Sequence, residues 1–302
     1  MERFGPSARS RVNWRSLLYV PANVPRFIAK AGPVGADAVV LDLDDSVPPR
    51  EKRAARDGLA EAVLRCRVGR TSVLVRVNRR LRDAVRDIET AVAAGCDGLL
   101  LPKVTGPEHV ALLSEVVDDL ELQTDGRRIV FVPMVETAAA VRQMNAIAVA
   151  SERNVGMIIG SEDLATECMI PADDELIITI KRQMVLAAAA AGISPFGLLG
   201  RSISQYRDLD AVRAAALRSR RSGFVGATCI HPSVVPVFNE AFLPEAEELD
   251  LANRQIKAAE EAERIGRGTV VVDGRMVDEP IVRRARHLVA ASHDFAIRHG
   301  ES

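Results

Sequence analysis

Short runs of apolar and β-branched residues alternate with longer helical stretches along most of the chain. Runs without polar interruption are typical of parallel strands that helices cover on both faces. The pattern predicts strands at Ser16–Pro21, Ala38–Asp45, Val73–Asn78, Gly98–Lys103, Arg128–Glu136, Gly156–Asp163, Pro195–Leu199 and Gly226–His231. The helices predicted between them are Pro25–Val34, Pro49–Leu64, Leu81–Ala94, Pro107–Leu120, Ala138–Ala150, Asp174–Ala190 and Leu209–Ser222.

Strict alternation of strands and helices is compatible with a doubly wound sheet or with a closed barrel. A doubly wound sheet usually has a glycine-rich phosphate loop after its first strand, but Ala22-Asn23-Val24-Pro25 follows that strand here. Nearly every predicted strand also ends in a polar residue, and in a TIM barrel such ends converge on one mouth. We therefore predict an α/β fold of the TIM (β/α)8 barrel type.

The alternation stops after residue 243, so we expect residues 1–243 to form the barrel and residues 244–302 an extension. The extension has a helix–hairpin–helix pattern, in which Asp-Gly is a common hairpin turn. Such an extension either packs on its own barrel or contacts a neighbouring subunit, and we expect the second. Its predicted elements are an acidic helix from Pro244, strands Thr269–Val272 and Arg275–Val277 around Asp273-Gly274, and a helix from Glu279 to about His299.

The charge balance excludes some classes of partner. Lys and Arg number 40 and Asp and Glu 41 among 302 residues, a net charge of −1 that gives little attraction to nucleic acid or an anionic membrane. The longest apolar run, Met184–Ile193, is far shorter than the about 20 residues of a membrane helix. We expect a cytoplasmic protein with dispersed, buried, reduced thiols at Cys66, Cys96, Cys168 and Cys229.

Two carboxylates follow successive predicted strands. Glu136 ends one apolar run and Asp163 ends the next. Adjacent strand ends would bring them within reach of one ion, and two carboxylates with waters and a bidentate substrate are a usual Mg²⁺ environment. The alternative is that each carboxylate stabilises the start of the following helix, at Thr137 and Leu164.

A cation and three acids occupy two other predicted strand ends. Arg76 interrupts an apolar strand, and its guanidinium suits either a substrate anion or the acids Asp42, Asp44 and Asp45. These acids form a solvated turn, or they orient metal-bound water and Arg76. Lys52, together with Arg56 one helical turn later, could neutralise the acids.

The remaining candidates each have a structural alternative. Arg26 and Lys30 share one helix face, which suits a phosphate or a solvated surface pair. His231 could act as a general base or hydrogen-bond to a loop carbonyl. Asp278, judged from the sequence alone, reads as an N-cap before Glu279-Pro280.

Eight motifs occur in a fixed order along about residues 15 to 290. They are RSLLYVPANVPRFIAKA, ADAVVLDLDDSVPPREKRAAR, VRVN, LLLPKV, PMVET, GSEDLATE, GATCIHPSVVPVFNEAFLP and DGRMVDEP. Each motif alone is weak, but the ordered set is highly specific. Together they resemble the citrate lyase β-subunit and malyl-CoA lyase-like proteins of the Mg²⁺-dependent aldolase superfamily.

The resemblance implies a TIM barrel in trimers or hexamers that cleaves or forms a β-hydroxyacyl-CoA thioester, giving an acyl-CoA and a 2-oxo acid. It implies that Glu136 and Asp163 bind Mg²⁺, with Glu136 also near the substrate, and that Arg76 contacts the oxo acid or the thioester enolate. It implies that Asp278 transfers a proton in a neighbouring subunit's site, in place of the N-cap interpretation. Less specifically, it places Arg26 and Lys30 near the CoA phosphates.

Two positions depart from the family pattern, which usually has LDLED where this chain has LDLDD, and Gly where it has Ala22. Asp44 is therefore one methylene shorter than the Glu of that pattern. A thioesterase, a non-catalytic CoA-binding subunit and a small class II aldolase without CoA remain as alternative functions.

Overall fold

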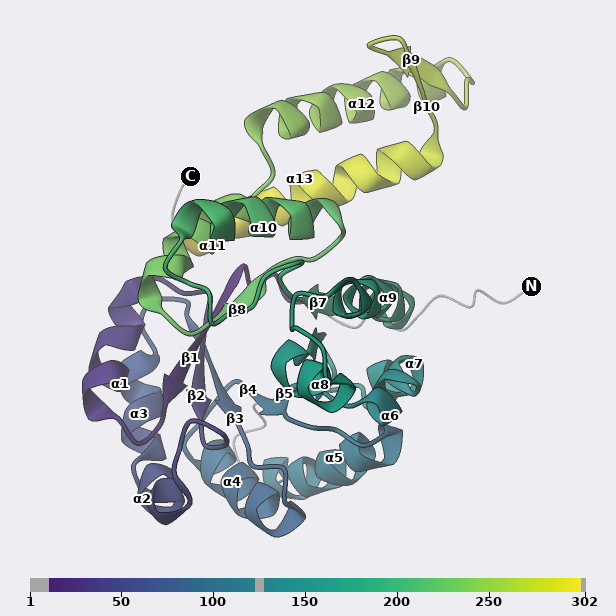
Figure 1. Cartoon of the computed structure of the whole chain (residues 1–302). Coiled ribbons are helices and arrows are strands. Elements are labelled where there is room, and N and C mark those ends of the chain that lie inside the picture. The colour runs from purple at the N-terminus through teal and green to yellow at the C-terminus, as the bar shows by residue number, and fades with distance from the viewer. Residues whose placement is uncertain (1–10, 123–127, 300–302) are drawn as a thin grey trace. The chain divides into compact units, whose positions relative to one another are not determined.

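The computed structural model describes residues 11–122 and 128–299, and the chain divides into two compact units, Met1–Phe242 and Leu243–Ser302. In the first unit, parallel strands form one eight-stranded sheet in the order β7-β6-β5-β4-β3-β2-β1-β8, and a bridge from Phe196 to Gly226 nearly closes the ring (Figure 1). This confirms the predicted barrel. Its strands are β1 (Ser16–Pro21), β2 (Ala38–Asp42), β3 (Ser72–Arg76), β4 (Gly98–Leu101), β5 (Val130–Val135), β6 (Gly156–Ile159), β7 (Ser194–Phe196) and β8 (Ala227–Cys229).

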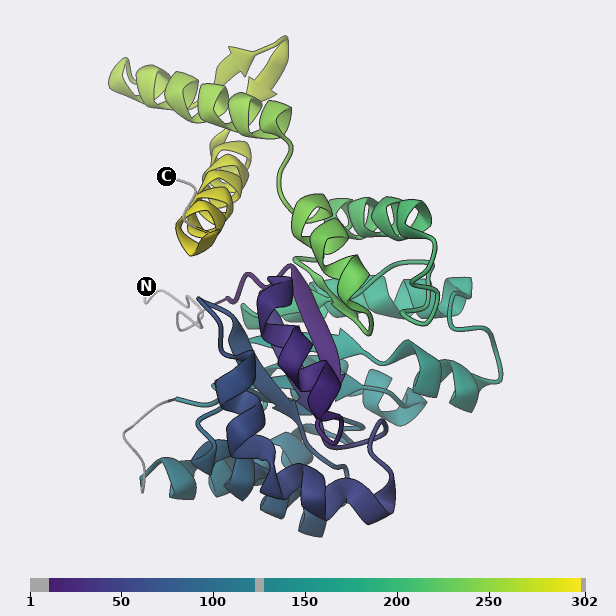
Figure 2. The same ribbon diagram turned by 90° about the vertical axis from the view of Figure 1, so that its left-hand side faces the viewer.

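Helices surround this ring of strands, as the view in Figure 2 also shows, where α1 lies along β1. They bury their apolar faces against the strands, which explains why the strands read as unbroken apolar runs. The helices are α1 (Pro25–Ala31), α2 (Lys52–Asp57), α3 (Leu59–Cys66), α4 (Leu81–Ala93), α5 (Pro107–Glu121), α6 (Ala138–Val141), α7 (Met144–Val149), α8 (Ser161–Cys168), α9 (Glu175–Ala191), α10 (Leu209–Arg221) and α11 (Val235–Ala241).

The inside of the barrel is a second, separate apolar core. Alternate strand residues such as Leu17, Val40 and Leu100 point into it and are completely buried. Trp14, just before β1, stacks on Phe196 with ring centroids 5.9 Å apart. The amino-terminal end of the barrel is thus filled by side chains, and the polar residues gather at the other end.

Several predicted boundaries were wrong. The run at Gly156–Asp163 is strand only to Ile159, because helix α8 begins at Ser161. Helices α8 and α11 were missed, and the helix predicted over Ala138–Ala150 is divided into α6 and α7. Strands β2 and β3 end at Asp42 and Arg76, earlier than predicted.

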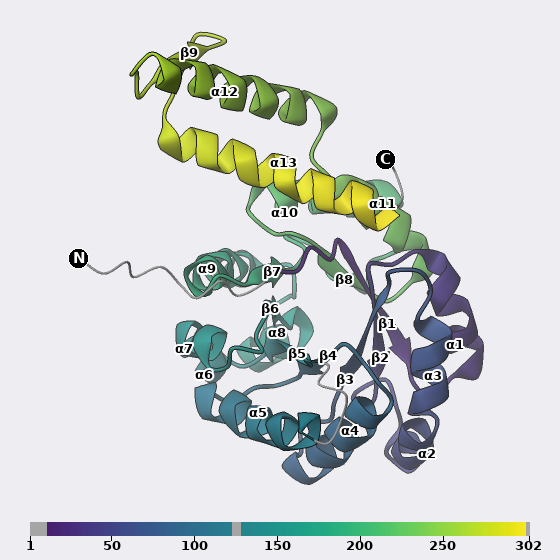
Figure 3. The ribbon, with the colours of Figure 1, turned by 180° about the vertical axis from the view of Figure 1, so that it is seen from behind.

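The second unit contains α12 (Ala246–Arg264), the hairpin strands β9 (Val270–Val272) and β10 (Arg275–Val277), and α13 (Glu279–His299). Helices α12 and α13 pack against each other, and the hairpin connects them (Figure 3). Asp273 and Gly274 have φ angles of 49° and 74°, the left-handed pair that a two-residue type I′ turn requires. The predicted helix–hairpin–helix extension is therefore confirmed.

The cysteines are free thiols, with Cys66, Cys96 and Cys229 buried and Cys168 half-buried. Between residues 11 and 299, leaving out 123–127, no helix has both the length and the apolar character needed to cross a membrane.

Candidate active site

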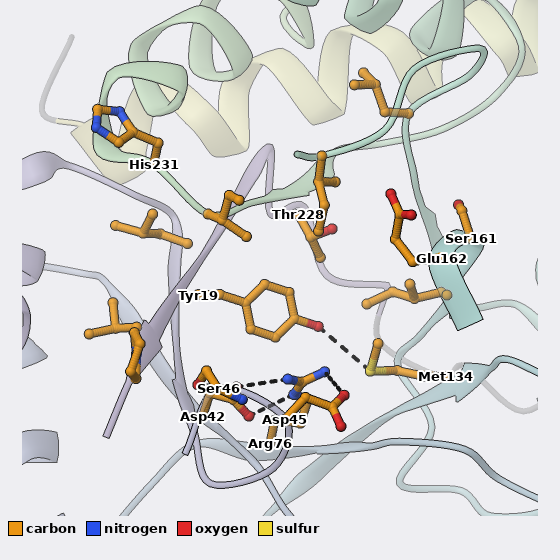
Figure 4. Close-up of a pocket in the computed structure, with 18 of the residues that line it drawn as sticks. Tyr19, Asp42, Asp45, Ser46, Arg76, Met134, Ser161, Glu162, Thr228 and His231 are labelled. Carbon is orange, nitrogen blue, oxygen red and sulfur yellow. Dashed lines mark hydrogen bonds and ion pairs between the residues drawn. The ribbon is translucent and has the colours of Figure 1, made fainter. Parts of the chain in front are cut away.

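A cavity of about 880 Å³ opens where the barrel strands end (Figure 4). Its lining residues lie in β1, β2, β3, β5, β6 and β8, mostly towards their carboxyl ends, or in the segments that follow the strands, so this is the carboxyl end of the barrel, where TIM-barrel enzymes place their active sites. Much of the wall is apolar. The predicted site residues in this wall are Arg26, Lys30, Asp42, Asp45, Arg76, Glu136, Asp163 and His231.

Arg76, which is partly exposed to the cavity, and the buried Asp42 form an ion pair at the ends of β3 and β2. The Nε and Nη2 atoms of Arg76 donate to the two carboxylate oxygens of Asp42, each at 2.7 Å. Burial raises the pKa of Asp42, but the guanidinium and the hydroxyl of Ser46 outweigh burial and hold that pKa below its usual range. Nη1 of Arg76 lies 3.3 Å from Asp45, and the ring centroid of Tyr19 is 5.1 Å from the guanidinium carbon. Arg76 is therefore a rigid cation at the cavity wall.

The other acids of the LDLDD stretch differ in exposure. Asp44 is buried, and Asp45 is exposed, so only Asp45 fits the solvated turn. Lys52 Nζ lies 3.7 Å from Asp44 and also donates to Asn78. Burial, followed by the charge of Asp45, raises the pKa of Asp44. Neither Asp44 nor Lys52 lines the cavity, so both act behind its wall.

The expectation for Arg56 was wrong. Its guanidinium does not turn to the LDLDD acids but pairs with the buried Asp87 at 2.9 Å. Asp87 in turn accepts hydrogen bonds from the backbone and side chain of Asn78.

Glu136 is a carboxyl group enclosed in the cavity wall. It is 2% exposed, and its Oε2 accepts a hydrogen bond from the backbone N–H of Lys103 at 2.6 Å. Burial raises its pKa to about 7, opposed by the Lys103 hydrogen bond and assisted by the charge of Asp163. A Cβ at Gly160 would stand 2.7 Å from Cδ of Glu136, so the glycine makes room for this side chain.

Asp163 lies in the first turn of α8, not at a strand end as predicted. Its side chain is half-exposed and lines the same cavity as Glu136. Nζ of Lys103 lies 3.9 Å from Asp163 and 2.9 Å from Asp45. Lys103 has a φ of 48°, in the left-handed region, and this backbone presents its N–H to Glu136 while its ammonium lies among the acids.

The residues present fit a magnesium ion. Within residues 11–122 and 128–299, no group of three or more His, Cys, Asp or Glu side chains could enclose a metal. Mg²⁺ does not need such a group, because it keeps several waters and takes one or two carboxylates together with substrate oxygens. Glu136, a buried carboxyl whose pKa is raised by burial, is a group that a cation would stabilise in its ionised form.

Arg26 and Lys30 lie on α1, exposed at the cavity, and the Arg26 guanidinium rests 4.9 Å from the ring centroid of Phe27. His231 accepts a hydrogen bond from the backbone N–H of Ser233 at 3.3 Å and stacks on Tyr206. It is thus held by the backbone N–H and the hydroxyl of Ser233 and by an aromatic ring, and among the residues described it makes no hydrogen bond to a loop carbonyl, which was the structural alternative.

Asp278 lies in the second unit and precedes α13. Its Oδ1 accepts from the backbone N–H of Ile281 at 3.4 Å, as an N-cap does. The expected role of Asp278 in proton transfer remains a prediction.

Sequence reasoning missed several residues of the cavity wall. Tyr19 lies beside Arg76, Glu162 accepts a hydrogen bond from Ser202, and the buried Lys181 lines the cavity. Lys181 had a usable signal, since it takes a core position on the apolar helix ELIITIKRQMVLAAAAA, one turn from Ile177 and Ile178.

Comparison with known proteins places the chain in a family. Residues 15–232 match the model of the HpcH/HpaI aldolase/citrate lyase family. A (3S)-malyl-CoA thioesterase of Cereibacter sphaeroides is 35% identical over 94% of this chain and 96% of its own. The citrate lyase subunit beta of Leuconostoc mesenteroides is 31% identical over 91% of this chain and 92% of its own.

A solved structure agrees with the sequence matches. CitE from Mycobacterium tuberculosis, in complex with magnesium, acetoacetate and coenzyme A, is similar with a TM-score of 0.72 and 27% identity, covering 94% of this chain and 99% of that one. The chain therefore belongs to the HpcH/HpaI aldolase/citrate lyase family of carbon–carbon lyases.

Proposed function

We propose that this enzyme cleaves, or forms, a β-hydroxyacyl-CoA thioester of the malyl-, citramalyl- or citryl-CoA type, giving an acyl-CoA and a 2-oxo acid with Mg²⁺ as cofactor. The observation that carries the proposal is the grouping of Glu136, Asp163 and Arg76 in one cavity at the carboxyl end of a family barrel. Two carboxylates for a cation and a rigid guanidinium for an anion are the groups that this chemistry needs.

Glu136 and Asp163 would hold the magnesium ion. When bound, the ion would supply Lewis-acid stabilisation of the oxygen on which charge develops during carbon–carbon cleavage. The Lys103 backbone N–H fixes one oxygen of Glu136, and Gly160 leaves space for its carboxylate. Calorimetric titration with Mg²⁺ tests this assignment, and we expect Glu136→Gln and Asp163→Asn to abolish the binding heat.

Arg76 would hold the enolate of the acyl thioester. Two of its N–H groups are bound to Asp42, which fixes the plane of the guanidinium, and the side chain lines the cavity. Such preorganised donors stabilise a developing oxyanion without reorganising during the reaction. In the cleavage direction the hydroxyl proton leaves to a base, the carbon–carbon bond breaks, and the enolate carbon takes up a proton.

Asp278 would supply that proton from a neighbouring subunit of a trimer or hexamer. The support is the resemblance of the DGRMVDEP segment to the family. Asp278 is the Asp of this segment that directly precedes Glu279, the first residue of α13. A mixing experiment tests it. Glu136→Gln and Asp278→Asn should each be inactive alone, and co-assembled subunits should recover part of the activity, since some sites then contain both native residues.

Arg26 and Lys30 would meet the phosphates of CoA, because both are exposed cations on α1 at the edge of the cavity. Replacing both with Met should raise the KM for the thioester with little change in kcat. A similar loss of affinity for the free 2-oxo acid would contradict this role.

A thioesterase is the second candidate, favoured by the 35% identity to a (3S)-malyl-CoA thioesterase. Product analysis separates the two reactions on malyl-CoA with Mg²⁺. Acetyl-CoA and glyoxylate would mean carbon–carbon cleavage, whereas free CoA and malate would mean hydrolysis. Formation of neither pair from any hydroxyacyl-CoA thioester would refute both candidates.

A further inference from the structure

A buried ammonium group in the cavity wall has no carboxylate partner. Lys181, on α9, is 4% exposed and lines the cavity. Its Nζ donates a hydrogen bond to the carbonyl oxygen of Leu198 at 2.7 Å. Among the residues described, no Asp or Glu oxygen lies within 4.0 Å of this nitrogen. The protein therefore provides one neutral acceptor for a buried cation.

Removing an ammonium from water is costly unless an anion compensates for the lost hydration. Burial lowers the pKa of Lys181 to about 8, with the charge of Glu162 acting in the opposite direction. At neutral pH the group therefore remains mostly protonated. Elsewhere in the barrel, buried cations have matched acids, such as Arg15 with Asp37 at 2.8 Å. Lys181 differs because its side chain borders open space that a ligand can enter.

The position of Lys181 separates it from the other cavity cations. Its contact with Leu198 places Nζ near the end of β7, and the strand order puts β7 across the ring from β3, which carries Arg76. In Figure 4, Arg76 is drawn below the ring of Tyr19, and Glu162 lies above and to the right of that ring. The positive charge of Arg76 is already balanced by Asp42 and Asp45.

Size restricts which anion can reach this ammonium. The phosphates of CoA are bulky and strongly hydrated, and the exposed Arg26 and Lys30 suit them. A carboxylate is small enough to enter a buried subsite, and a charge-assisted bond from an ammonium is short and strong. The ligand that fits has one anionic end near Glu136, Asp163 and Arg76 and another near Lys181.

We propose that Lys181 binds the second carboxylate of a dicarboxylic 2-oxo acid and thereby makes the enzyme prefer dicarboxylic to monocarboxylic oxo-acid units. This inference rests on the proposed lyase function, of which the oxo acid is a product. Lys181 is a specificity-determining residue in this role, because it contacts the remote carboxylate of the oxo acid and not the atoms of the carbon–carbon bond that breaks.

Calorimetry on the full chain with Mg²⁺ tests the proposal with two probes of similar size. Oxaloacetate has the second carboxylate, and 2-oxopentanoate lacks it. We expect the wild type to bind oxaloacetate about 10- to 100-fold more tightly, the range expected for one charge-assisted hydrogen bond. Lys181→Met should remove most of this ratio and leave the Kd of 2-oxopentanoate within about twofold. Lys181→Arg should keep part of the ratio.

The control is Lys257→Met, which removes the same charge from an exposed position on α12 and should keep the ratio. An unchanged ratio in Lys181→Met would overturn the inference and leave the lyase proposal standing. A parallel loss of affinity for both acids would also overturn it, because the Leu198 contact would then be purely structural. If the wild type bound neither acid in the presence of Mg²⁺, the proposed function and this inference would both fail.

Discussion

Replacing Glu136 by Gln should make the metal-free protein more stable, and the gain should depend on pH. The carboxyl group is 2% exposed, and burial raises its pKa from 4.5 to about 7. Gln has nearly the same shape and keeps an oxygen that can accept the Lys103 N–H. The substitution therefore removes the cost of burying a charge and keeps the packing.

The magnitude follows from the two pKa values. Below about pH 4.5 the group is protonated in folded and unfolded chains alike, so it costs nothing. Between 4.5 and about 7 the unfolded chain ionises while the folded chain stays protonated, and stability falls by about 1.4 kcal/mol per pH unit. Above about pH 7 the penalty is complete at roughly 3 kcal/mol.

Urea denaturation in EDTA measures the difference in unfolding free energy between the variant and the wild type. The fluorescence of Trp14, the single tryptophan, reports unfolding of the barrel, because this side chain is 3% exposed and stacks on Phe196. Glu136→Gln should match the wild type within about 1 kcal/mol at pH 5 and exceed it by roughly 3 kcal/mol at pH 8. Glu115→Gln, an exposed control on α5, should show no such dependence. A gain that is equal at both pH values would refute the reasoning.

Three further substitutions test other contacts of the site. Arg76→Met leaves the buried Asp42 carboxylate without its guanidinium partner, so denaturation should show that the free energy of unfolding falls by about 3–5 kcal/mol. Asp45→Asn, at an exposed position, should lower it by less than about 1 kcal/mol. Gly160→Ala should weaken Mg²⁺ binding in calorimetry, because the new Cβ would clash with the Glu136 side chain. Gly268→Ala is the control, because its new Cβ would have no atom within 4 Å. Lys103→Met should tighten Mg²⁺ binding by roughly tenfold, since it removes a competing cation 3.9 Å from Asp163; weaker binding would mean that Lys103 instead positions the acids.

The barrel could be predicted because its strands are buried on both faces, whereas its helices bury one face and expose the other. This difference in periodicity is local and survives in the sequence, so all eight strands of the ring were located, with errors mainly at their ends. The hairpin was predictable for a similar reason, since Asp273-Gly274 favours left-handed φ angles without help from the rest of the fold.

The error at Asp163 came from reading an apolar run one element too far. The run GMII ends at Ile159, and Ser161, Glu162 and Asp163 form an acidic first turn, which is a helix-start signal. The prediction placed Asp163 at a strand end, whereas the structure places it on a helix, and its side chain still lines the cavity with Glu136. The acids were thus found from their types and order, while the element that positions Asp163 was not.

Contacts across the barrel could not be predicted from the sequence. Lys103 approaches Asp45, Asp44 and Asp163, which belong to segments 58 to 60 residues away in either direction, and its backbone adopts a left-handed conformation that its sequence gives no reason to expect. Likewise, Arg56 has several acids within reach by sequence spacing, and only the packing of α2 against α4 selects Asp87.

Charge balance distinguishes the two ends of the barrel. At the amino-terminal end, Arg15 and Asp37 are both buried and satisfy each other, which stabilises the fold and leaves nothing for a ligand. At the carboxyl end, Glu136 is a buried acid whose pKa burial raises, and Lys181 is a buried cation held by a single carbonyl. A buried acid and a buried cation would stabilise the fold most if they formed an ion pair with each other. In one cavity they instead stay apart, which is the arrangement expected where a cation and an anionic substrate together complete the pairing.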